Sequence, residues 1–515
     1  MTLDTPTNFA TLDAVIVGVY LLVTTLAGVL ANRRVGGVAA YLVGGRAAGT
    51  SLNAASYIGT GLGLVTLMYA SIDAFSNGFS YVTLALISFV VSVFLGLTGF
   101  VIGPLRRLEL LTISEFFEHR FDRRTRILGG GIGALAGILN MGLFPKMGAT
   151  FVTFLTGASL TAPGAETTVN LVMSLLIVLV VAYTVLGGMI SVLVTDYLQF
   201  VVLTVGLLIG VAACLWHPQL GWDRMLQTMA EERGARMFSP VADGGYGWVW
   251  VLFNGVVFFA AAVCWAPEAS RALTASSERV ARRTFLIAAP GQFMRLAVPS
   301  LFAVAMFCLV AQTPELQAHF FPHGLAGDAA NAEQAMPYLL SRIVPSGALG
   351  LVAAGALAAF MSTHDSYLLC WASVLTRDVY GPLAGKPLSA KAQIRLTRIG
   401  VVAIGVFLLV WGVWYELPES VWTYMAVTGT IYMSGATVVL IGGLYWPRAS
   451  SAGALAALLG GLVAVVGLFR DGLSRWTGID VPSEVIGLGS YVFCAILFVG
   501  FSLAIPDRER AGRPR

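Results

Sequence analysis

Five consecutive polar residues, Ser362, Thr363, His364, Asp365 and Ser366, interrupt a strongly apolar part of the sequence. Hydroxyl and carboxylate oxygens are suitable ligands for a small cation. Ser362 and Thr363 are adjacent, so on a helix their side chains point about 100° apart and can lean toward one neighbouring segment. The alternative is helix packing, because Ser and Thr hydroxyls also bond carbonyls of their own helix. A carboxylate near the middle of a membrane costs about 2.5–3.5 kcal/mol, so Asp365 is expected to be paired and functional.

The composition identifies the setting of this cluster as a membrane. Of the 515 residues, 57% are apolar and 11% are charged, whereas soluble domains are about 25% charged. Apolar stretches of about 20 residues recur along the whole chain, which is typical of membrane-spanning helices. The alternating pattern of a membrane β-barrel is absent. The sequence therefore predicts an all-α polytopic membrane protein.

The hydropathy pattern predicts 13 transmembrane helices. They are expected near 12–31, 51–75, 79–102, 128–158, 166–187, 189–216, 247–270, 284–311, 347–376, 397–415, 420–446, 451–470 and 484–505. The two longest loops, about 217–246 and 312–346, are too short for a large soluble domain. We therefore expect a single membrane-embedded domain over 1–515.

The basic residues indicate the orientation, because cytoplasmic loops carry an excess of Lys and Arg. With the N-terminus outside and the C-terminus cytoplasmic, 23 of the 31 Lys and Arg residues fall in inner loops or the tail, including Arg271. Six fall in outer loops, and two, Lys146 and Arg295, lie inside spans. We expect a multi-pass protein of the inner (plasma) membrane.

Two of the expected spans carry helix-breaking residues. The span at 51–75 contains Gly59, Gly61 and Gly63, and the span at 247–270 ends with Pro267. Glycine weakens a helix and proline removes a backbone hydrogen bond, and such breaks survive in a membrane where they line a site. Interrupted spans at matching places in two groups of five are typical of transporters with inverted repeats.

Six sequence stretches, in order along the chain, resemble motifs of the sodium/solute symporter family, which includes the sodium/glucose and sodium/proline cotransporters. They are YLVGGR (41–46), LTISEFFEHRF (111–121), GGMISVLVTDYLQF (187–200), SRALTASSERVARR (270–283), MSTHDS with LTRDVY (361–380), and GLYWPRASSAGALAALLGG (443–461). The likeness extends from about residue 40 to residue 460.

The resemblance implies a LeuT-type fold, which is a five-plus-five inverted repeat. One helix at 12–31 would precede the first repeat at 51–216. The second repeat at 247–446 would be followed by two further helices at 451–505. The resemblance also implies a secondary active transporter in which inward sodium movement drives uptake of a small organic solute. Sodium would then be transported rather than held as a fixed cofactor.

The family also implies ligands for the ion. Its hydroxyl pair at the position of Ser362 and Thr363 binds sodium, together with backbone carbonyls one turn earlier and in the broken first span. Carried over to this sequence, those carbonyls belong to Ala359, Ala54 and Tyr57.

A second ion is a further implication. Some family members bind sodium between an aspartate, here Asp196, and polar residues one turn after the hydroxyl pair, here Asp365 and Ser366. Asp365 departs from the small or hydroxyl residue that is common there. It could bind the ion, take a proton or pair with a cation, or it could simply bridge two helices.

The candidate substrate residues are Arg295, Lys146 and Trp265. Arg295 lies where a sugar-transporting relative has a substrate-contacting lysine, and Trp265 lies at the broken span where the family places a substrate contact. Arginine can hold a carboxylate through two hydrogen bonds. The expected substrate is an organic anion, an amino acid or a sugar, and core packing is the alternative for Trp265.

Other functions remain possible from the sequence. A proton could replace sodium in the same fold. A membrane-embedded enzyme would need clustered His, Asp or Glu, and only His364 with Asp365 offers this inside a span. We therefore expect no catalytic residues and no enzyme activity. The expected partners are a small-molecule substrate and the lipid bilayer, with no nucleic acid.

Overall fold

The protein is built from helices. The computed structural model describes residues 5–31, 48–157, 164–385, 388–415, 420–470, 474–475 and 478–507. YLVGGR (41–46) lies outside these residues. The helices are α1 (Thr11–Ala31), α3 (Thr50–Gly61), α4 (Leu64–Asn77), η3 (Gly78–Tyr81), α5 (Val82–Thr98), α6 (Ile102–Arg107), α7 (Ile113–Arg120), α8 (Arg123–Asn140), η4 (Met141–Leu143), α9 (Phe144–Leu155), α10 (Ala165–Trp216), α11 (Trp222–Arg233), η5 (Gly234–Met237), α12 (Trp248–Cys264), α13 (Ala266–Thr274), α14 (Glu278–Ala311), α15 (Pro314–Phe320), α16 (Ala332–Ile343), α17 (Ala348–Val374), η6 (Leu375–Tyr380), α18 (Gly381–Leu383), α19 (Ala390–Trp414), α20 (Val421–Tyr445), α21 (Ser451–Gly460), η7 (Gly461–Phe469) and α23 (Ser483–Ala504).

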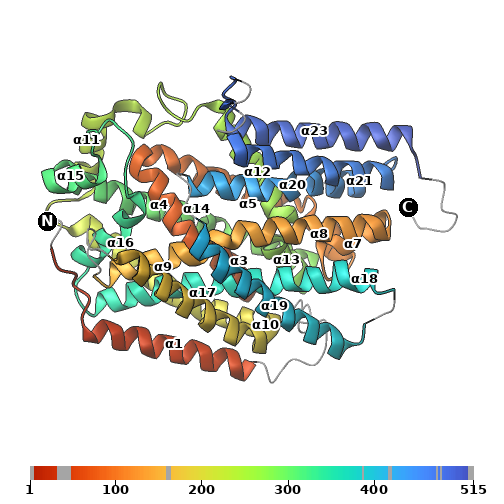
Figure 1. Ribbon diagram of the computed structural model, residues 1–515, viewed down its shortest axis with the longest axis horizontal. Coiled ribbons are helices and arrows are strands. Elements are labelled where there is room, and N and C mark those ends of the chain that lie inside the picture. Colours follow the sequence, from red (N-terminus) through yellow and green to blue (C-terminus); the bar gives the residue numbers. More distant parts are fainter. Residues whose placement is uncertain are drawn as a thin grey trace.

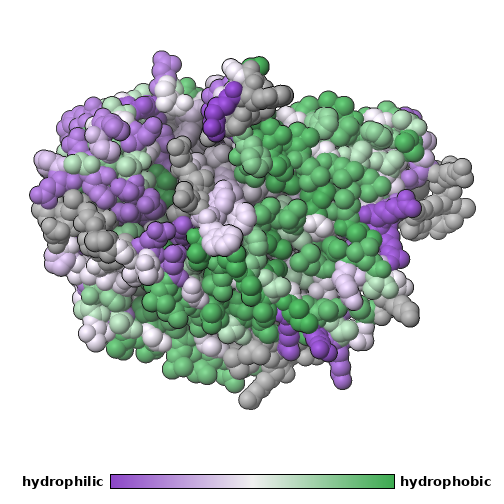
Figure 2. Space-filling model, viewed as in Figure 1, coloured by the Kyte–Doolittle hydropathy of each residue, from purple (hydrophilic) through white to green (hydrophobic). Residues whose placement is uncertain are grey.

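The helices form a multi-pass membrane protein, as predicted. Eleven helical segments of the described chain are long and apolar enough to cross a membrane, or twelve when the bent pair α12 and α13 counts as one span. On the face shown in Figure 2, hydrophobic residues cover the broad middle, and hydrophilic residues gather at the end that carries α11 and α15. The expected total of 13 spans and the inverted-repeat relation between 51–216 and 247–446 stay predictions.

The two ends of the helix bundle differ. The short helices α11 and α15, from the loops expected outside, lie at one end, where α1 begins (Figure 1). The short helices α7 and α18 lie at the opposite end, where α23 ends (Figure 1). These are the segments that the charge pattern assigned to opposite sides of the membrane.

Both predicted helix breaks are present. α3 ends at Gly61 and α4 begins at Leu64, so Leu62 and Gly63 form the break. α12 ends at Cys264 and α13 begins at Ala266 with a bend of 47° between them. α3 packs against α10, α13, α14 and α17. Residues 53–61 of this helix are buried in the bundle and shielded from lipid.

One buried carboxylate anchors the first helix to the helix that carries the polar cluster. Asp13 of α1 is fully buried. It accepts hydrogen bonds from the Ser346 hydroxyl (2.8 Å) and from the backbone N–H groups of Gly347 (2.7 Å) and Gly350 (2.5 Å). Gly350 lies in the first turn of α17, where N–H groups have no partner within the helix. Asp13 therefore caps α17 from a neighbouring helix.

We expect Asp13→Asn to destabilise the protein by about 2 kcal/mol, because the cap loses its negative charge and one acceptor. The measurement is the melting temperature of purified protein in detergent. The matched control is Asp243→Asn, since Asp243 is exposed in the loop before α12. Equal melting temperatures for the two variants would contradict the capping role.

Candidate functional site

The C-terminal end of α3 presents backbone carbonyls that its own helix cannot satisfy. The last four carbonyls of a helix lack N–H partners one turn later. The carbonyl of Ile58 accepts from the N–H of Leu62 at 2.7 Å. The carbonyls of Gly59, Thr60 and Gly61 instead face side chains of other segments. Because α3 is surrounded by helices, these oxygens are held away from bulk water.

Two hydroxyls of α17 meet these carbonyls. Ser362 Oγ lies 3.0 Å from the carbonyl oxygen of Gly59 and 3.3 Å from that of Ala359 in its own helix. Thr363 Oγ1 lies 3.3 Å from the carbonyl oxygen of Thr60. All of these groups are buried. Five oxygens from α3 and α17 thus meet in two groups built on adjacent residues, and hydroxyl and carbonyl oxygens are donors that suit a hard monovalent cation.

Glycine at position 63 permits this contact. A Cβ atom built on Gly63 would overlap the Thr363 hydroxyl. Any larger residue there would push α17 away from the break. The Gly59, Gly61 and Gly63 pattern therefore has a packing role in addition to weakening the helix.

The structure brings together only part of the expected sodium ligand set. Ala359, Ser362 and Thr363 lie together, as described above. The hydroxyls contact the carbonyls of Gly59 and Thr60, which follow Ala54 and Tyr57 along α3. Ala54 and Tyr57 lie inside the regular part of this helix, and the Tyr57 ring packs against Phe285 with centroids 4.8 Å apart.

A buried arginine joins the residues expected to hold a second ion. Arg271 and Asp196 both have fully buried side chains, and Arg271 Nη2 lies 3.2 Å from Asp196 Oδ2. The same Nη2 donates to Ser366 Oγ at 2.9 Å and to the Thr60 hydroxyl. Ser56 also donates to Asp196, at 2.5 Å. Asp196 and Ser366 thus share a guanidinium, which the sequence had not predicted.

The expectation that Arg271 lies in an inner loop was wrong. Arg271 lies in α13, the half-helix that follows the second break, and its side chain is fully buried. The charge count assigned Arg271 to a loop because the sequence after Pro267 resembles the start of a loop. The signal that could have found it is Pro267 itself, since a half-helix after a membrane break stays inside the protein.

Asp365 lies beside this arginine cluster but has different partners. Its Oδ2 accepts from the Tyr183 hydroxyl at 3.1 Å. Neither Asp365 Oδ1 nor Asp196 Oδ1 has a hydrogen-bond partner among the described residues, and both atoms are buried. Two ionised carboxylates and one guanidinium would carry a net formal charge of −1 in a dry environment, which favours either one additional cation or protonation of a carboxylate. His364 is not part of this group, because its Nδ1 contacts the Phe360 carbonyl at 2.7 Å and its ring packs on Phe144.

A cavity of about 70 Å³ lies next to the end of α3. It is lined by Thr60, Gly61, Thr66, Tyr69, Asn140, Phe144, Phe258, Trp265, Glu268, Arg295, Thr363, Tyr367 and Trp422, among others. Trp265 and Arg295 thus lie where substrate contacts were expected, and Thr60 and Thr363 belong to both the cavity and the oxygen cluster. A solute in the cavity would therefore touch the same residues as the ion.

Lys146 does not line this cavity. Its Nζ donates to the Tyr415 carbonyl at 3.2 Å. Phe144, two residues earlier, and Asn140 of α8 face the cavity instead. The expectation that Lys146 contacts substrate stays a prediction, and this arrangement gives it no support.

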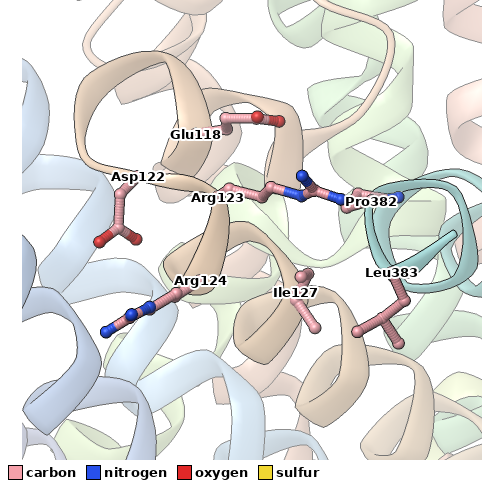
Figure 3. A pocket seen from close by; sticks show the side chains of 7 residues that line it. All are labelled: Glu118, Asp122, Arg123, Arg124, Ile127, Pro382 and Leu383. Carbon is pink, nitrogen blue, oxygen red and sulfur yellow. The ribbon is translucent and has the colours of Figure 1, made fainter. Parts of the chain in front are cut away.

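A second hollow of about 600 Å³ lies on the surface between α8 and α18. It is lined by Glu118, Asp122, Arg123, Arg124, Ile127, Pro382 and Leu383, and Arg123 extends across it toward Pro382 (Figure 3). Its walls belong to the end of the molecule that the charge pattern places inside. The hollow and the central cavity have no lining residue in common.

Comparison with known proteins gives a consistent result. The sequence pattern of the sodium:solute symporter family matches residues 41–461. The sodium/sialic acid symporter SiaT of Proteus mirabilis is 23% identical over 463 residues, covering 87% of each chain. The high-affinity proline transporter PutP of Bacillus subtilis is 23% identical, covering 94% of this chain and 98% of its own. The solved structure of a substrate-bound, outward-open Na⁺-coupled sialic acid symporter superposes with a TM-score of 0.77 at 20% identity, covering 97% of this chain and all of the other.

The two broken helices, the oxygen cluster and the adjoining buried cavity define a multi-pass membrane transporter with a LeuT-like fold. This agrees with the similarity to solved transporters. The chain belongs to the sodium:solute symporter family. It is therefore a sodium-coupled solute symporter and not an enzyme, as the sequence predicted.

Proposed function

We propose that the transported sodium ion binds between the end of α3 and the middle of α17. Its ligands are the carbonyls of Gly59, Thr60 and Ala359 and the hydroxyls of Ser362 and Thr363. The observation that carries the proposal is the meeting of both hydroxyls with carbonyls at the helix break. Sodium would occupy the centre of this group and replace the direct hydroxyl–carbonyl contacts. Gly59 and Thr60 take the place of Ala54 and Tyr57 in the ligand set.

We expect Ser362→Ala and Thr363→Ala each to raise the sodium concentration that gives half-maximal uptake. Loss of one oxygen ligand weakens binding by about 1–3 kcal/mol, or roughly 5- to 150-fold. The measurement is uptake into proteoliposomes at varied sodium and constant ionic strength. Because the substrate is identified only by class, sodium-dependent thermal stabilisation of purified protein is a second readout.

Ser373→Ala is the matched control, because Ser373 is a buried serine of the same helix. Among the described residues, its hydroxyl bonds only the Leu369 carbonyl of its own previous turn. Its sodium dependence should match that of the unmodified protein. Equal uptake in sodium and potassium at fixed pH would refute sodium coupling through this site and favour the proton-coupled alternative.

A second cation is proposed at Asp365. The support is the net formal charge of −1 shared by Asp196, Arg271 and Asp365, together with two buried carboxylate oxygens that lack partners among the described residues. Arg271 already neutralises Asp196, so Asp365 is the principal ligand. Ser366 contributes only if it turns away from Arg271.

We expect the Hill coefficient for sodium to exceed one in the unmodified protein and to fall toward one in Asp365→Asn. The amide removes the negative charge but keeps the size and the Tyr183 contact. Uptake at saturating sodium should remain measurable. An unchanged Hill coefficient with a shifted pH profile of uptake would make Asp365 a proton-binding group or the partner of another cation. If neither the coefficient nor the pH profile changes in Asp365→Asn, the carboxylate serves packing between α10 and α17.

The proposed setting is the plasma membrane, with the N-terminus outside and the C-terminus cytoplasmic. The excess of basic residues at the α7 and α18 end supports this orientation. A green fluorescent protein fused after Arg515 should fluoresce, and alkaline phosphatase fused at the same place should be inactive. The opposite result would place the C-terminus outside the cell.

A further inference from the structure

The central cavity contains an acid as well as a base. Among the described residues that line it, Glu268 and Arg295 carry a formal charge. The sequence indicated Arg295 as a substrate contact and left organic anions, amino acids and sugars open, but Glu268 was not considered there. Glu268 lies in the first turn of α13, directly after the second helix break. Its side chain is 13% exposed, and that of Arg295 is 7% exposed.

The contact between these two groups is loose. Arg295 Nη1 lies 3.5 Å from Glu268 Oε1, whereas a charge-assisted hydrogen bond is about 2.7–2.9 Å long. The same Nη1 lies 3.4 Å from the Gly61 carbonyl, and Nε has no partner among the described residues. The guanidinium lies over the Phe258 ring at 5.3 Å. It is thus held in place by neighbours that leave part of its hydrogen-bonding capacity unused.

The position of Arg295 is fixed by the first break. A Cβ atom on Gly61 would lie 2.6 Å from Arg295 Nη1, so the guanidinium rests against the bare backbone of α3. Glu268 holds the corresponding place beside the second break. A solute that separates the pair would therefore contact both broken helices at once.

We propose that the solute is a small zwitterion of the amino-acid class, whose carboxylate binds Arg295 and whose ammonium group binds Glu268. This inference rests on the proposed solute site in the central cavity. A zwitterion can enter between the two side chains and leave each charge with a partner. A simple anion would take Arg295 from Glu268 and leave a buried carboxylate uncompensated, which is unfavourable. The aromatic walls from Trp265, Tyr69 and Phe258 also suit an ammonium group.

The other polar contacts in the cavity agree with this arrangement. Trp265 Nε1 already donates to the Tyr367 hydroxyl at 3.0 Å, so the indole N–H is not available to the solute. The small volume of the cavity favours a compact solute. Glu268 is thus a specificity-determining residue, because it separates zwitterions from anions of the same shape.

The test uses purified full-length protein in sodium and two matched sets of probes. The first set is L-alanine, propionate and ethylamine, and the second is L-proline, cyclopentanecarboxylate and pyrrolidine. D-glucose represents neutral sugars. Binding is measured by thermal stabilisation and by quenching of tryptophan fluorescence. We expect at least one amino acid to bind at least about tenfold more tightly than its anion and amine counterparts. Each counterpart lacks one of the two charged groups and therefore loses one charged contact.

Glu268→Gln should weaken binding of that amino acid by roughly 10- to 100-fold, because the amide keeps the shape and loses the charge. Binding of the matched anion should be equal or tighter, so the preference for the zwitterion should disappear. The matched control is Glu278→Gln. It breaks another Glu–Arg pair, with Arg107 at 3.2 Å, at the start of α14 and outside the cavity lining. This control should bind like the unmodified protein.

Three results would overturn the inference. The first is binding of an anion as tightly as its amino acid in the unmodified protein. The second is binding of glucose with no amino acid bound, and the third is the absence of amino-acid binding in sodium. Stabilisation by sodium alone is recorded for every variant. If sodium does not stabilise the unmodified protein, the proposed sodium site is refuted. If sodium stabilises the protein but zwitterions are not preferred, only the role of Glu268 is refuted.

Discussion

The unsatisfied carbonyls at the end of α3 are the constraint on which the site depends. Carbonyls without partners are costly inside a membrane protein, and those of Gly59, Thr60 and Gly61 meet side chains from three other helices. Ser362 and Thr363 come from α17, Arg295 comes from α14, and Thr66 of α4 bonds the Gly61 carbonyl at 3.0 Å. Four polar side chains from three helices thus lie at one helix end inside the membrane-spanning bundle. In the proposed mechanism, sodium binds the carbonyls of Gly59 and Thr60, and the solute binds Arg295, which lies beside the carbonyl of Gly61.

The half-helix α13 contributes one residue to each of two buried ion pairs near this end, which form two charged clusters. Arg271 and Glu268 lie three residues apart on α13, and they pair with Asp196 and with Arg295. Breaking a buried ion pair costs about 3–5 kcal/mol, so neither cluster can be rearranged cheaply without a replacement charge. A bound ion or a zwitterionic solute provides such a charge. Because both clusters touch α3 and α13, the proposed sites predict coupling between ion and solute binding, and such coupling must be reciprocal.

Much of the fold could be predicted from the sequence because its signals are local. Long apolar stretches predict spans, and Gly63 and Pro267 mark breaks whose positions the structure confirms. The residues of the oxygen cluster were harder to predict from the sequence. The family resemblance placed the first-span ligands at Ala54 and Tyr57, whereas the hydroxyls contact Gly59 and Thr60. The residue at which α3 ends decides which carbonyls are free, and that residue depends on packing against α14 and α17.

The charged residues around the breaks were the hardest to assign. Arg271 was counted with an inner loop although it is fully buried, and Glu268 was not singled out at all. Both lie on a half-helix whose nine residues carry too little apolar sequence to be recognised as part of a span. Their roles follow from partners that are distant in sequence, namely Asp196 and Arg295. Such pairing requires the three-dimensional arrangement.

Hydrogen–deuterium exchange with and without sodium tests whether the ion binds between the end of α3 and α17. The full-length protein is compared in sodium and in potassium at equal ionic strength, with no solute present. Sodium should slow exchange in peptides that cover 59–66 and 359–366, with smaller effects elsewhere, because the ion ties the end of α3 to α17. Equal exchange of these peptides in the two salts, or sodium protection confined to other helices, would refute sodium binding between α3 and α17.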